Sequence, residues 1–476
     1  MIRLLKIVFT FLFIFQSTTL IAQNKAQAFL QKMVQKKELQ NASISAYAID
    51  LNTQQVILET TPQLSIVPAS ILKLVTTASA LEILGADYQF TTTLAYSGKI
   101  KSDSTLYGDL IIKGGGDPAF CSEYFKEQYD SIWINWAKAL KEKGIKKVNG
   151  KICFDVSIFD NEQVPNTWIW EDIGNYYGAG ASGLSVADNK YTIVFQSLKQ
   201  ANRPTKIVEI IPSIPNLKIE NQVLSSDVPR DNAYVFGSPF EAKRVVRGTI
   251  PKNRKRFRVK ASMPNPPIYA ATLMQKELEK AGIQFQSKEI LQWQNAKKTV
   301  SVVAEHQSPQ LIDIIRQTNH KSINLFAEHL LKTIGLRQLQ SGSTKAGTKA
   351  IKAYWEEQSL DVSNLFLVDG SGLSRFNAIT AQQMTSILAC MNKTVFESTL
   401  PQAGKEGTLE YRFRNLPNSI IVKAKTGSMT RARALAGYIH TEDRDIAFAI
   451  LVNNYAGKSS KIEQDIDSFV LSLTQD

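Results

Sequence analysis

The sequence predicts an α+β fold, and three features of this 476-residue chain lead to it. Antiparallel strands are expected near both ends, helical periodicity dominates the segments between them, and short β-type runs broken by Gly, Pro and Asn fill the middle. One domain should therefore form from residues 23–94 and 268–476. A β-rich insertion at 95–267, with a nested sub-domain near 200–250, should interrupt it.

The N-terminal part of the predicted domain begins with a hairpin and continues into a helix. Residues 42–60 alternate in polarity and turn midway, a pattern typical of two antiparallel strands. Pro68 suits the first turn of a helix, apolar residues then recur with helical spacing, and Gly85 suits its end. We expect a largely apolar helix between these two residues.

The C-terminal part should supply the remaining helices and three further strands. Helical spacing recurs over 269–282, 310–316, 323–336 and 344–359. Three strands are expected at 419–429, 434–441 and 445–454, and a last helix near 460–473 should cover the sheet.

The first 22 residues differ from the rest of the chain. Arg3 and Lys6 carry their only charges, and the run from Leu4 to Phe15 is almost wholly apolar. This pattern is typical of a secretory signal peptide, expected at 1–22; the alternative is an uncleaved anchor, for which the apolar run is short. We therefore expect an exported protein of the periplasm, soluble or loosely membrane-associated.

The formal charge of the whole chain is +13, and much of the excess is local. Residues 243–260, KRVVRGTIPKNRKRFRVK, hold nine Lys or Arg and no acid. A basic exported protein suggests an anionic neighbour, such as cell-wall polymer or a membrane surface; the alternative is a solvated hairpin. Nucleic acid is not expected as a partner, because the chain is predicted to be exported and no nucleic-acid motif accompanies the run.

PASILK at 68–73 places Ser70 and Lys73 three positions apart in the first turn of the predicted helix. Residues i and i+3 are neighbours on a helix, and a helix N-terminus favours an oxyanion. A serine needs a base beside it to become a nucleophile, and a lysine serves only when desolvation or another cation lowers its pKa. The alternative is a plain helix-start serine with a solvated lysine.

A second candidate segment is HKSINLFAEHLLK at 320–332, which contains Ser322 and Asn324. Residues i and i+2 do not share a helix face, so both side chains point one way only if they lie in a turn before the helix. Simple helix capping is the alternative, because Ser and Asn both favour helix starts.

A third candidate segment is VKAKTGSM at 422–429, which contains Lys425-Thr426-Gly427 within a predicted strand. Glycine in a strand allows another backbone to approach closely. An extended peptide could therefore add to the edge of this strand.

Ser-x-x-Lys, Ser-x-Asn and Lys-Thr-Gly, in this order, form the set shared by penicillin-binding proteins and serine β-lactamases. The chain resembles the low-molecular-mass class C penicillin-binding proteins, which are exported D-alanyl-D-alanine carboxypeptidase/endopeptidases with a β-lactamase-like transpeptidase domain. The resemblance covers nearly all of the mature chain, including the long insertion between Ser70 and Ser322. It also includes GDLIIKGGGDP at 108–118, WIWEDIGNYYGAGAS at 168–182, DGSGLSR at 369–375 and GKEGTLEYR at 404–412.

The resemblance implies a catalytic role for five residues. Ser70 would attack the carbonyl between two D-alanines and become acylated, and Lys73 would take its proton. Ser322, backed by Lys425, would relay a proton to the departing amine, while Asn324 would hold the substrate amide. Water would then release the acyl group, and β-lactam antibiotics would acylate the same serine.

The resemblance also implies how the peptide is held. The backbone N–H groups of Ser70 and Ser428 would form the oxyanion hole, Thr426 would bind a terminal carboxylate, and Gly427 would admit the peptide. Asp172, after the W-x-W pattern, would pair with the ammonium of a diaminopimelate side chain; an ordinary Asp in a polar loop is the alternative.

Three functions remain open from the sequence. The first is a serine D,D-peptidase acting on peptidoglycan stem peptides. The second is a β-lactamase or esterase on the same scaffold, and the third is a non-catalytic cell-wall-binding protein. No cofactor or metal is expected, because GGGDP at 114–118 lacks the Lys-Ser/Thr of a phosphate-binding loop and the four histidines form no ligand motif.

Overall fold

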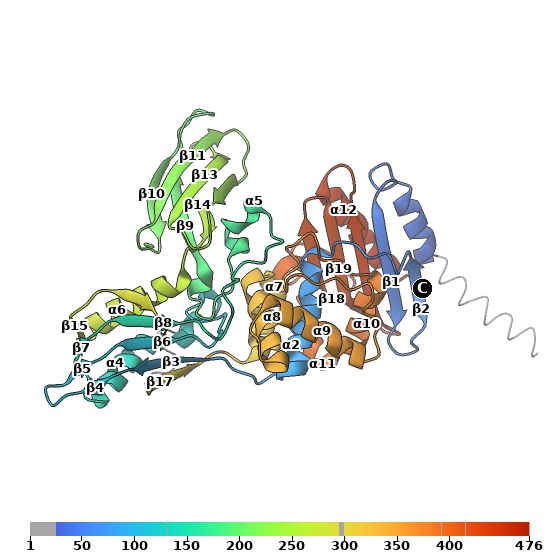
Figure 1. The fold of residues 1–476 in the computed structure, drawn as a ribbon. Helices are drawn as coiled ribbons and strands as arrows, with labels where there is room; N and C mark the ends of the chain where they lie inside the picture. Colours follow the sequence, from blue (N-terminus) through green and yellow to red (C-terminus); the bar gives the residue numbers. More distant parts are fainter. Residues whose placement is uncertain (1–24, 130, 295–298, 392, 415, 476) are drawn as a thin grey trace, which may run out of the picture.

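The computed structural model describes residues 25–129, 131–294, 299–391, 393–414 and 416–475 (Figure 1). The leader predicted at 1–22 lies outside the described residues. Within the described ranges, no helix combines the length and the apolar character needed to cross a bilayer. An antiparallel sheet flanked by helices carries a large β-rich insertion, so the predicted α+β fold class is confirmed.

A five-stranded sheet brings the two ends of the chain together. Its order is β18-β19-β20-β1-β2, and every pairing is antiparallel. The strands are β1 (Ser43–Asp50), β2 (Val56–Thr60), β18 (Ile421–Met429), β19 (Ala432–His440) and β20 (Asp445–Asn453). The predicted N-terminal hairpin and the three predicted C-terminal strands are therefore confirmed, and β18 lies at an edge.

Helices lie on both sides of this sheet because its strands direct alternate apolar side chains into two cores. Ala447 and Ala449 of β20 pack in one core, whereas Phe448 and Ile450 pack in the other. The first side holds η1 (Ala69–Ile71), α2 (Leu72–Leu84), α7 (Leu311–Lys321), α8 (Asn324–Leu339), α9 (Thr344–Glu357) and α10 (Ala381–Cys390). The second side holds α12 (Ser459–Ser472). Of these, α10 has no counterpart among the predicted helices.

The lower part of the insertion in Figure 1 contains two sheets. Their orders are β16-β8-β6-β3-β17 and β15-β7-β5-β4. The strands are β3 (Thr91–Tyr96), β4 (Lys99–Ile100), β5 (Thr105–Tyr107), β6 (Leu110–Lys113), β7 (Lys147–Asn149), β8 (Ile152–Asp155), β15 (Gln284–Phe285), β16 (Ile290–Gln292) and β17 (Ser301–Gln307). Helices α4 (Ile132–Glu142) and α6 (Pro266–Lys280) accompany them.

A second part of the insertion forms the green lobe of Figure 1 and contains two three-stranded sheets, β10-β9-β14 and β11-β13-β12. The strands are β9 (Lys190–Gln196), β10 (Lys206–Ile211), β11 (Lys218–Ser226), β12 (Asn232–Phe236), β13 (Lys243–Pro251) and β14 (Phe257–Ser262). Strands β13 and β14 do not pair with each other, because each completes a different sheet. The hairpin considered for 243–260 is therefore wrong.

The domain boundaries stay a prediction, but the strand pairing favours a later return to the first domain. Strands β15, β16 and β17 pair with β7, β8 and β3 of the insertion. This pairing favours a boundary near residue 308 over the predicted one at 268.

Candidate active site

Ser70 lies in η1, directly before α2, so its helical segment continues to Lys73. The preceding Ala69 has a φ of 48°. Gly372 packs so closely that a β-carbon there would lie 2.0 Å from the Ala69 carbonyl oxygen. The loop at 369–374 therefore abuts the start of this helical segment, while the Ser70 side chain itself is half-buried and accessible.

The Lys73 amine is fully buried and has three acceptors around it. Its Nζ lies 3.2 Å from Ser70 Oγ, 2.6 Å from Asn324 Oδ1 and 2.7 Å from the carbonyl oxygen of Ser371. A neutral amine has two hydrogens and one lone pair. Because the two shorter contacts can take both hydrogens, the lone pair is left to accept the Ser70 hydroxyl proton.

Burial controls the protonation of both motif lysines. It lowers the pKa of Lys73 to about 7, although the carboxylates of Asp369 and Glu328 oppose the fall. Burial, followed by the charge of Lys73, lowers the pKa of Lys425 well below its ordinary value. Lys73 can therefore lose its proton near neutral pH, whereas a lysine in water would stay protonated there.

The Ser-x-Asn triplet forms the turn between α7 and α8. Ser322 ends α7 in the left-handed conformation, with φ 57° and ψ 45°, Ile323 is extended, and Asn324 begins α8. The predicted turn is confirmed. Ser322 Oγ accepts a hydrogen bond from Lys425 Nζ at 2.9 Å, while Asn324 Nδ2 donates to the carbonyl oxygen of Tyr177 at 2.8 Å. These contacts and those of the Lys73 amine bring all three motif segments together.

Strand β18 approaches the segment that holds Ser70 through its glycine. A β-carbon at Gly427 would lie 2.6 Å from the carbonyl oxygen of Pro68. The backbone that lies close to this glycine therefore belongs to the protein itself, just before Ser70. Lys425 lies on the same strand, and its Nζ also donates to the Thr426 carbonyl oxygen at 2.9 Å.

The outer edge of β18 is covered at one end. Backbone hydrogen bonds join residues 401–403 to Val422 and Ala424. Because backbone N–H directions alternate along a strand, the N–H groups of Thr426 and Ser428 face the same edge beyond this cover. An added peptide strand would therefore meet the edge from about residue 426 onward.

The three predicted peptide-binding residues of this strand lie together. Thr426, Gly427 and Ser428 line a cavity of about 120 Å³ that Arg412 and Arg433 also line. Each of the two guanidinium groups pairs with a carboxylate of α12. The cavity therefore places the open end of β18 beside two guanidinium groups and the Glu463 carboxylate, so its wall carries charges of both signs.

Asp172 lies in α5 (Trp170–Ile173) of the insertion and is half-buried. Burial raises its pKa, whereas a hydrogen bond from the Tyr177 hydroxyl opposes this rise. Tyr177 also accepts the Asn324 amide through its backbone carbonyl. One residue therefore connects Asp172 to the Ser-x-Asn motif, and the charge of Arg375 also opposes the rise in the pKa of Asp172.

Sequence reasoning missed two buried carboxylates, Glu328 and Asp369. Glu328 accepts the backbone N–H groups of Gly370, at 3.0 Å, and Ser371, at 2.8 Å. Burial, followed by the charge of Asp369, raises the pKa of Glu328 to about 7. Glu328 follows Asn324 by four residues, so the i, i+4 rule for helix faces was the available signal. For Asp369, in an irregular loop, the sequence offers no such spacing.

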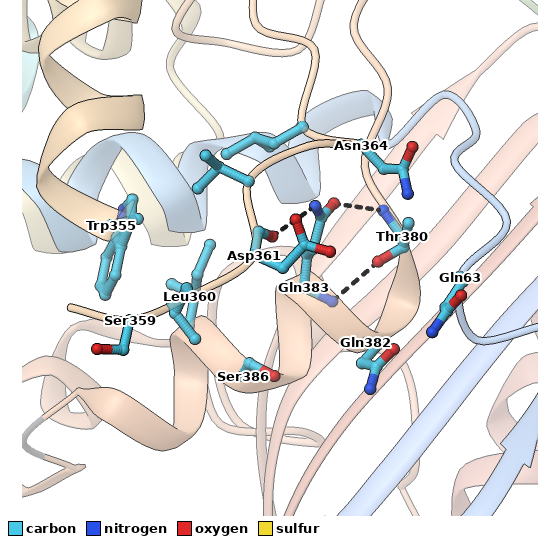
Figure 2. Close-up of a pocket in the computed structure, with 13 residues that line it drawn as sticks. Gln63, Trp355, Ser359, Leu360, Asp361, Asn364, Thr380, Gln382, Gln383 and Ser386 are labelled. Carbon is cyan, nitrogen blue, oxygen red and sulfur yellow. Dashed lines mark hydrogen bonds between the residues drawn. The ribbon is translucent and has the colours of Figure 1, made fainter. Parts of the chain in front are cut away.

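The pocket drawn in Figure 2 lies apart from this site, between α9 and α10. It measures about 270 Å³, and its lining includes Trp355, Asp361 and Gln383, whose amide donates to the Asp361 carbonyl oxygen. Among the described residues that line it, none is a predicted site residue.

Comparison with known proteins identifies the family. A family model described as the D-Ala-D-Ala carboxypeptidase 3 (S13) family matches residues 26–473. This chain belongs to that family. The S13 peptidase is 28% identical to the D-alanyl-D-alanine carboxypeptidase DacB of Haemophilus influenzae, over 88% of this chain and 86% of that protein. It is also 28% identical to the D-alanyl-D-alanine carboxypeptidase of Actinomadura sp., over 92% and 82% respectively.

Solved structures agree with this assignment. The S13 peptidase matches the crystal structure of penicillin binding protein 4 from Haemophilus influenzae with a TM-score of 0.81 and 26% identity, over 94% of this chain and 99% of that one. A second structure of that protein, complexed with a β-lactam, matches with a TM-score of 0.73 and 25% identity, over 93% and 98%. The predicted resemblance to class C penicillin-binding proteins is confirmed, and this S13 peptidase is a serine peptidase.

Proposed function

We propose that this S13 peptidase hydrolyses D-Ala-D-Ala termini, D-Ala–diaminopimelate cross-links, or both, in peptidoglycan through an acyl-serine intermediate. One observation carries the proposal: two amine–hydroxyl pairs meet in one site, Lys73 with Ser70 at 3.2 Å and Lys425 with Ser322 at 2.9 Å. The first pair suits activation of a nucleophile, and the second suits delivery of a proton to a leaving amine.

Acylation follows from the arrangement of these groups. Ser70 Oγ bonds to the carbonyl carbon of the penultimate D-Ala while its proton moves to the neutral Lys73 amine. The peptide C–N bond then breaks, and the departing amine receives a proton from Ser322 Oγ, which Lys425 Nζ replenishes. The backbone N–H groups of Ser70 and Ser428 stabilise the oxyanion between these steps.

Deacylation and binding use the same groups. Water attacks the acyl carbon and its proton passes to the neutral Lys425 amine, while Ser70 Oγ leaves and takes back the proton held by the Lys73 ammonium. Thr426 at the open end of β18 holds a terminal carboxylate, and Gly427 keeps that end close to Ser70. Asn324 positions the substrate amide, since its side chain is fixed between Lys73 and Tyr177.

A labelled penicillin tests the acyl-serine chemistry. Intact-protein mass spectrometry should show one adduct per chain, and peptide mapping should locate it on the peptide that holds Ser70. The Ser70→Ala variant should show no adduct but keep its circular-dichroism spectrum. A wild-type chain without an adduct would refute the proposal and favour a non-catalytic wall-binding protein. Rapid loss of the adduct would favour a β-lactamase instead.

Diaminopimelate recognition is assigned to Asp172. Its half-buried carboxylate lies one residue, Tyr177, away from the motif amide of Asn324. Asp172→Ala should lower turnover of diaminopimelate-containing peptides and leave penicillin acylation intact. Glu171→Ala is the matched control, because Glu171 is an exposed neighbouring acid in the same helix. Equal loss of peptide turnover and penicillin acylation in Asp172→Ala would speak against this role.

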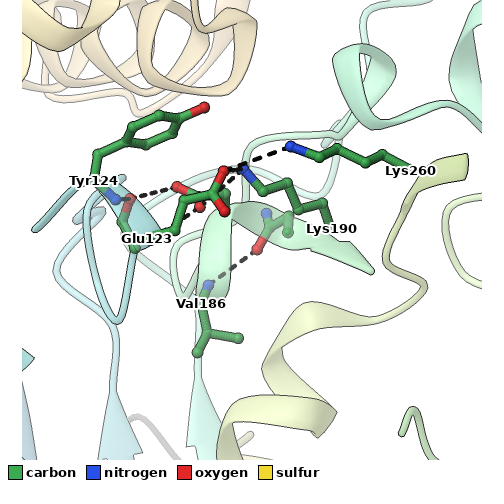
Figure 3. A network of polar contacts seen from close by, with 8 residues as sticks. Glu123, Tyr124, Val186, Lys190 and Lys260 are labelled. Atoms are coloured by element: carbon green, nitrogen blue, oxygen red, sulfur yellow. Dashed lines mark hydrogen bonds and ion pairs between the residues drawn. The ribbon is translucent and has the colours of Figure 1, made fainter. Parts of the chain in front are cut away.

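The predicted leader and the basic run 243–260 support a location at the cell wall, exported to the periplasm. Five of the nine cations are exposed and lie outside the ion pairs of the described residues: Lys243, Arg247, Arg254, Lys255 and Arg258. The others are less available, because Arg244 is buried and three lysines or arginines pair with acids. Figure 3 shows one such network, in which Lys190 and Lys260 approach Glu123. The exposed set suits an anionic wall or membrane surface.

A further inference from the structure

The loop between Asp369 and Ser374 provides one of the three acceptors of the Lys73 amine. That acceptor, the carbonyl oxygen of Ser371, belongs to the peptide unit between Ser371 and Gly372. The N–H of the same peptide unit donates to Asp369 Oδ1 at 2.8 Å. A single peptide group therefore separates the Lys73 ammonium from a buried carboxylate, with its dipole aligned between them.

The Asp369 carboxylate is fully occupied by donors. Oδ1 accepts Gly372 N–H and, at 2.7 Å, Asn377 Nδ2. Oδ2 accepts Ser374 N–H at 2.6 Å and the indole Nε1–H of Trp168 at 2.9 Å. Four donors to four lone-pair positions favour the ionised form, although burial raises the pKa of Asp369. Its side chain is therefore held in one orientation.

Glu328 fixes the other side of the same loop. Its carboxylate accepts the N–H groups of Gly370 and Ser371, so both peptides before the Lys73 acceptor are tied to α8. Trp168, which donates to Asp369, comes from the insertion, and Glu328 comes from α8, whose first residue is Asn324. The loop is thereby fastened to the two elements that border the substrate site.

We propose that Asp369 and Glu328 are positioning residues, which hold the peptide unit between Ser371 and Gly372 against the Lys73 amine. The inference rests on the proposed acyl-serine function. The carboxylates do not touch substrate; they act through Ser371 and through their charge, which favours protonated Lys73.

The charged groups around Lys73 determine how its pKa, and with it the pH profile of acylation, responds to a substitution. Glu328 comes from α8, Lys425 from β18, and Asp369 from the loop. Against α2, the neighbouring α7 provides the amide of Asn319 and α9 the indole of Trp355, both uncharged. Residues 381–390, which form α10, include no charged side chain.

The test is the pH profile of acylation by a fluorescent penicillin. Asp369→Asn removes the negative charge, so Lys73 should lose its proton at lower pH. The rising part of the rate–pH profile on its acid side, the acid limb, should shift to lower pH by about one unit. The plateau rate should fall roughly tenfold, because the Ser371 carbonyl is held less well. Asp369→Glu keeps the charge, so its limb should stay at the wild-type pH although its plateau falls.

Asp117→Asn is the matched control. Asp117 is an equally buried carboxylate that accepts Ala119 N–H and the Tyr129 hydroxyl, in the insertion and outside the contacts of Lys73. Its limb and plateau should both match the wild type. A slower Asp369→Asn variant whose limb does not move would overturn the inference, because a purely structural residue would behave in this way.

Glu328→Gln keeps the inference testable if circular dichroism shows that Asp369→Asn does not fold. Its acid limb should move in the same direction by a smaller amount, and an unmoved limb would overturn the inference. The two proposals fail separately: a wild-type chain without an adduct on Ser70 refutes the acyl-serine function, whereas an acylated wild type with unmoved limbs in the variants refutes only the role of the carboxylates.

Discussion

We expect the Lys73 amine to set the pH at which Ser70, the proposed nucleophile, becomes reactive. Since burial lowers the pKa of Lys73 to about 7, its base form is scarce below that pH and predominates above it. We expect the rate of penicillin acylation to rise through pH of about 7 and to level off above it. Lys73→Arg should abolish acylation throughout, because a guanidinium stays protonated. Stopped-flow fluorescence checks this, and a flat wild-type profile across that pH would contradict it.

At the same scale, the sequence identified the motif residues but not the residues that hold them in place. Ser70, Lys73, Ser322 and Lys425 stand in short patterns whose chemistry limits the residue types that can serve. Asp369 could not be found in this way, because its partners are backbone N–H groups and an indole from distant segments. Such contacts depend on loop conformation, which local spacing does not encode.

At the scale of elements, the approach of the 369–374 loop to η1 depends on Gly372. This glycine has a φ of 80°, and a β-carbon would collide with the Ala69 carbonyl oxygen. We expect Gly372→Ala to slow acylation at least about tenfold, because the clash displaces Ser70, and to reduce the free energy of unfolding by more than about 2 kcal/mol.

Gly144→Ala is the control for this prediction. Gly144 has a φ of 79° but no atom within 4 Å of an added β-carbon, so it shares the backbone strain without the collision. Its unfolding free energy should fall by about 1–2 kcal/mol, and its acylation rate should not change. Equal effects of the two substitutions on acylation would show that the contact with η1 does not matter.

Helix α8 also fastens the insertion through a buried histidine. The ring nitrogens of His329 lie 2.7 Å from the Gly116 carbonyl oxygen and 2.8 Å from Ser185 Oγ. Burial lowers the pKa of His329 to about 3. In the unfolded chain its ordinary pKa is 6.5, so the unfolded state binds a proton first as the pH falls. This group therefore favours the fold fully above pH 6.5 and loses that contribution towards about pH 3.

Urea unfolding of the wild type and of His329→Gln measures this contribution. Between pH 6.5 and about 4.5, the wild type should lose about 2–3 kcal/mol of unfolding free energy more than the variant does. His306→Gln is a control at a half-exposed histidine, and its pH dependence should stay closer to the wild type. If both variants lose stability in parallel with the wild type, His329 is not the titrating group.

At the scale of the whole molecule, the sequence predicted the order of the main parts better than their limits. Strand and helix periodicity located the sheet, because apolar alternation survives in its buried strands. The residue at which the chain leaves the insertion and re-enters the first domain was harder to predict. Helix α6 has ordinary helical spacing, and nothing in its sequence indicates which sheet it covers. Strands β15 to β17 are short, and only pairing with β7, β8 and β3 assigns them to the insertion.

The charge distribution of the whole molecule leads to a prediction about association. Arg254→Glu combined with Lys255→Glu should weaken binding to anionic lipid vesicles, and the wild-type binding should fall as ionic strength rises. The same charge change at Lys345 and Lys349, two exposed lysines one turn apart on α9, is the control and should have a smaller effect. Cosedimentation measures both, and penicillin acylation should be equal in all three chains.

The partial cover on β18 has a consequence for the molecule in solution. A bare outer strand offers unpaired backbone groups to any other chain, which promotes fibre formation. Here residues 401–403 occupy the stretch around Val422 and Ala424, so the remaining bare stretch is only a few residues long. We expect a short peptide to bind there, whereas two copies of the protein cannot pair along the full strand. The predicted peptide-binding end of β18 thus stays open, while the cover shortens the stretch of this strand along which two copies could pair.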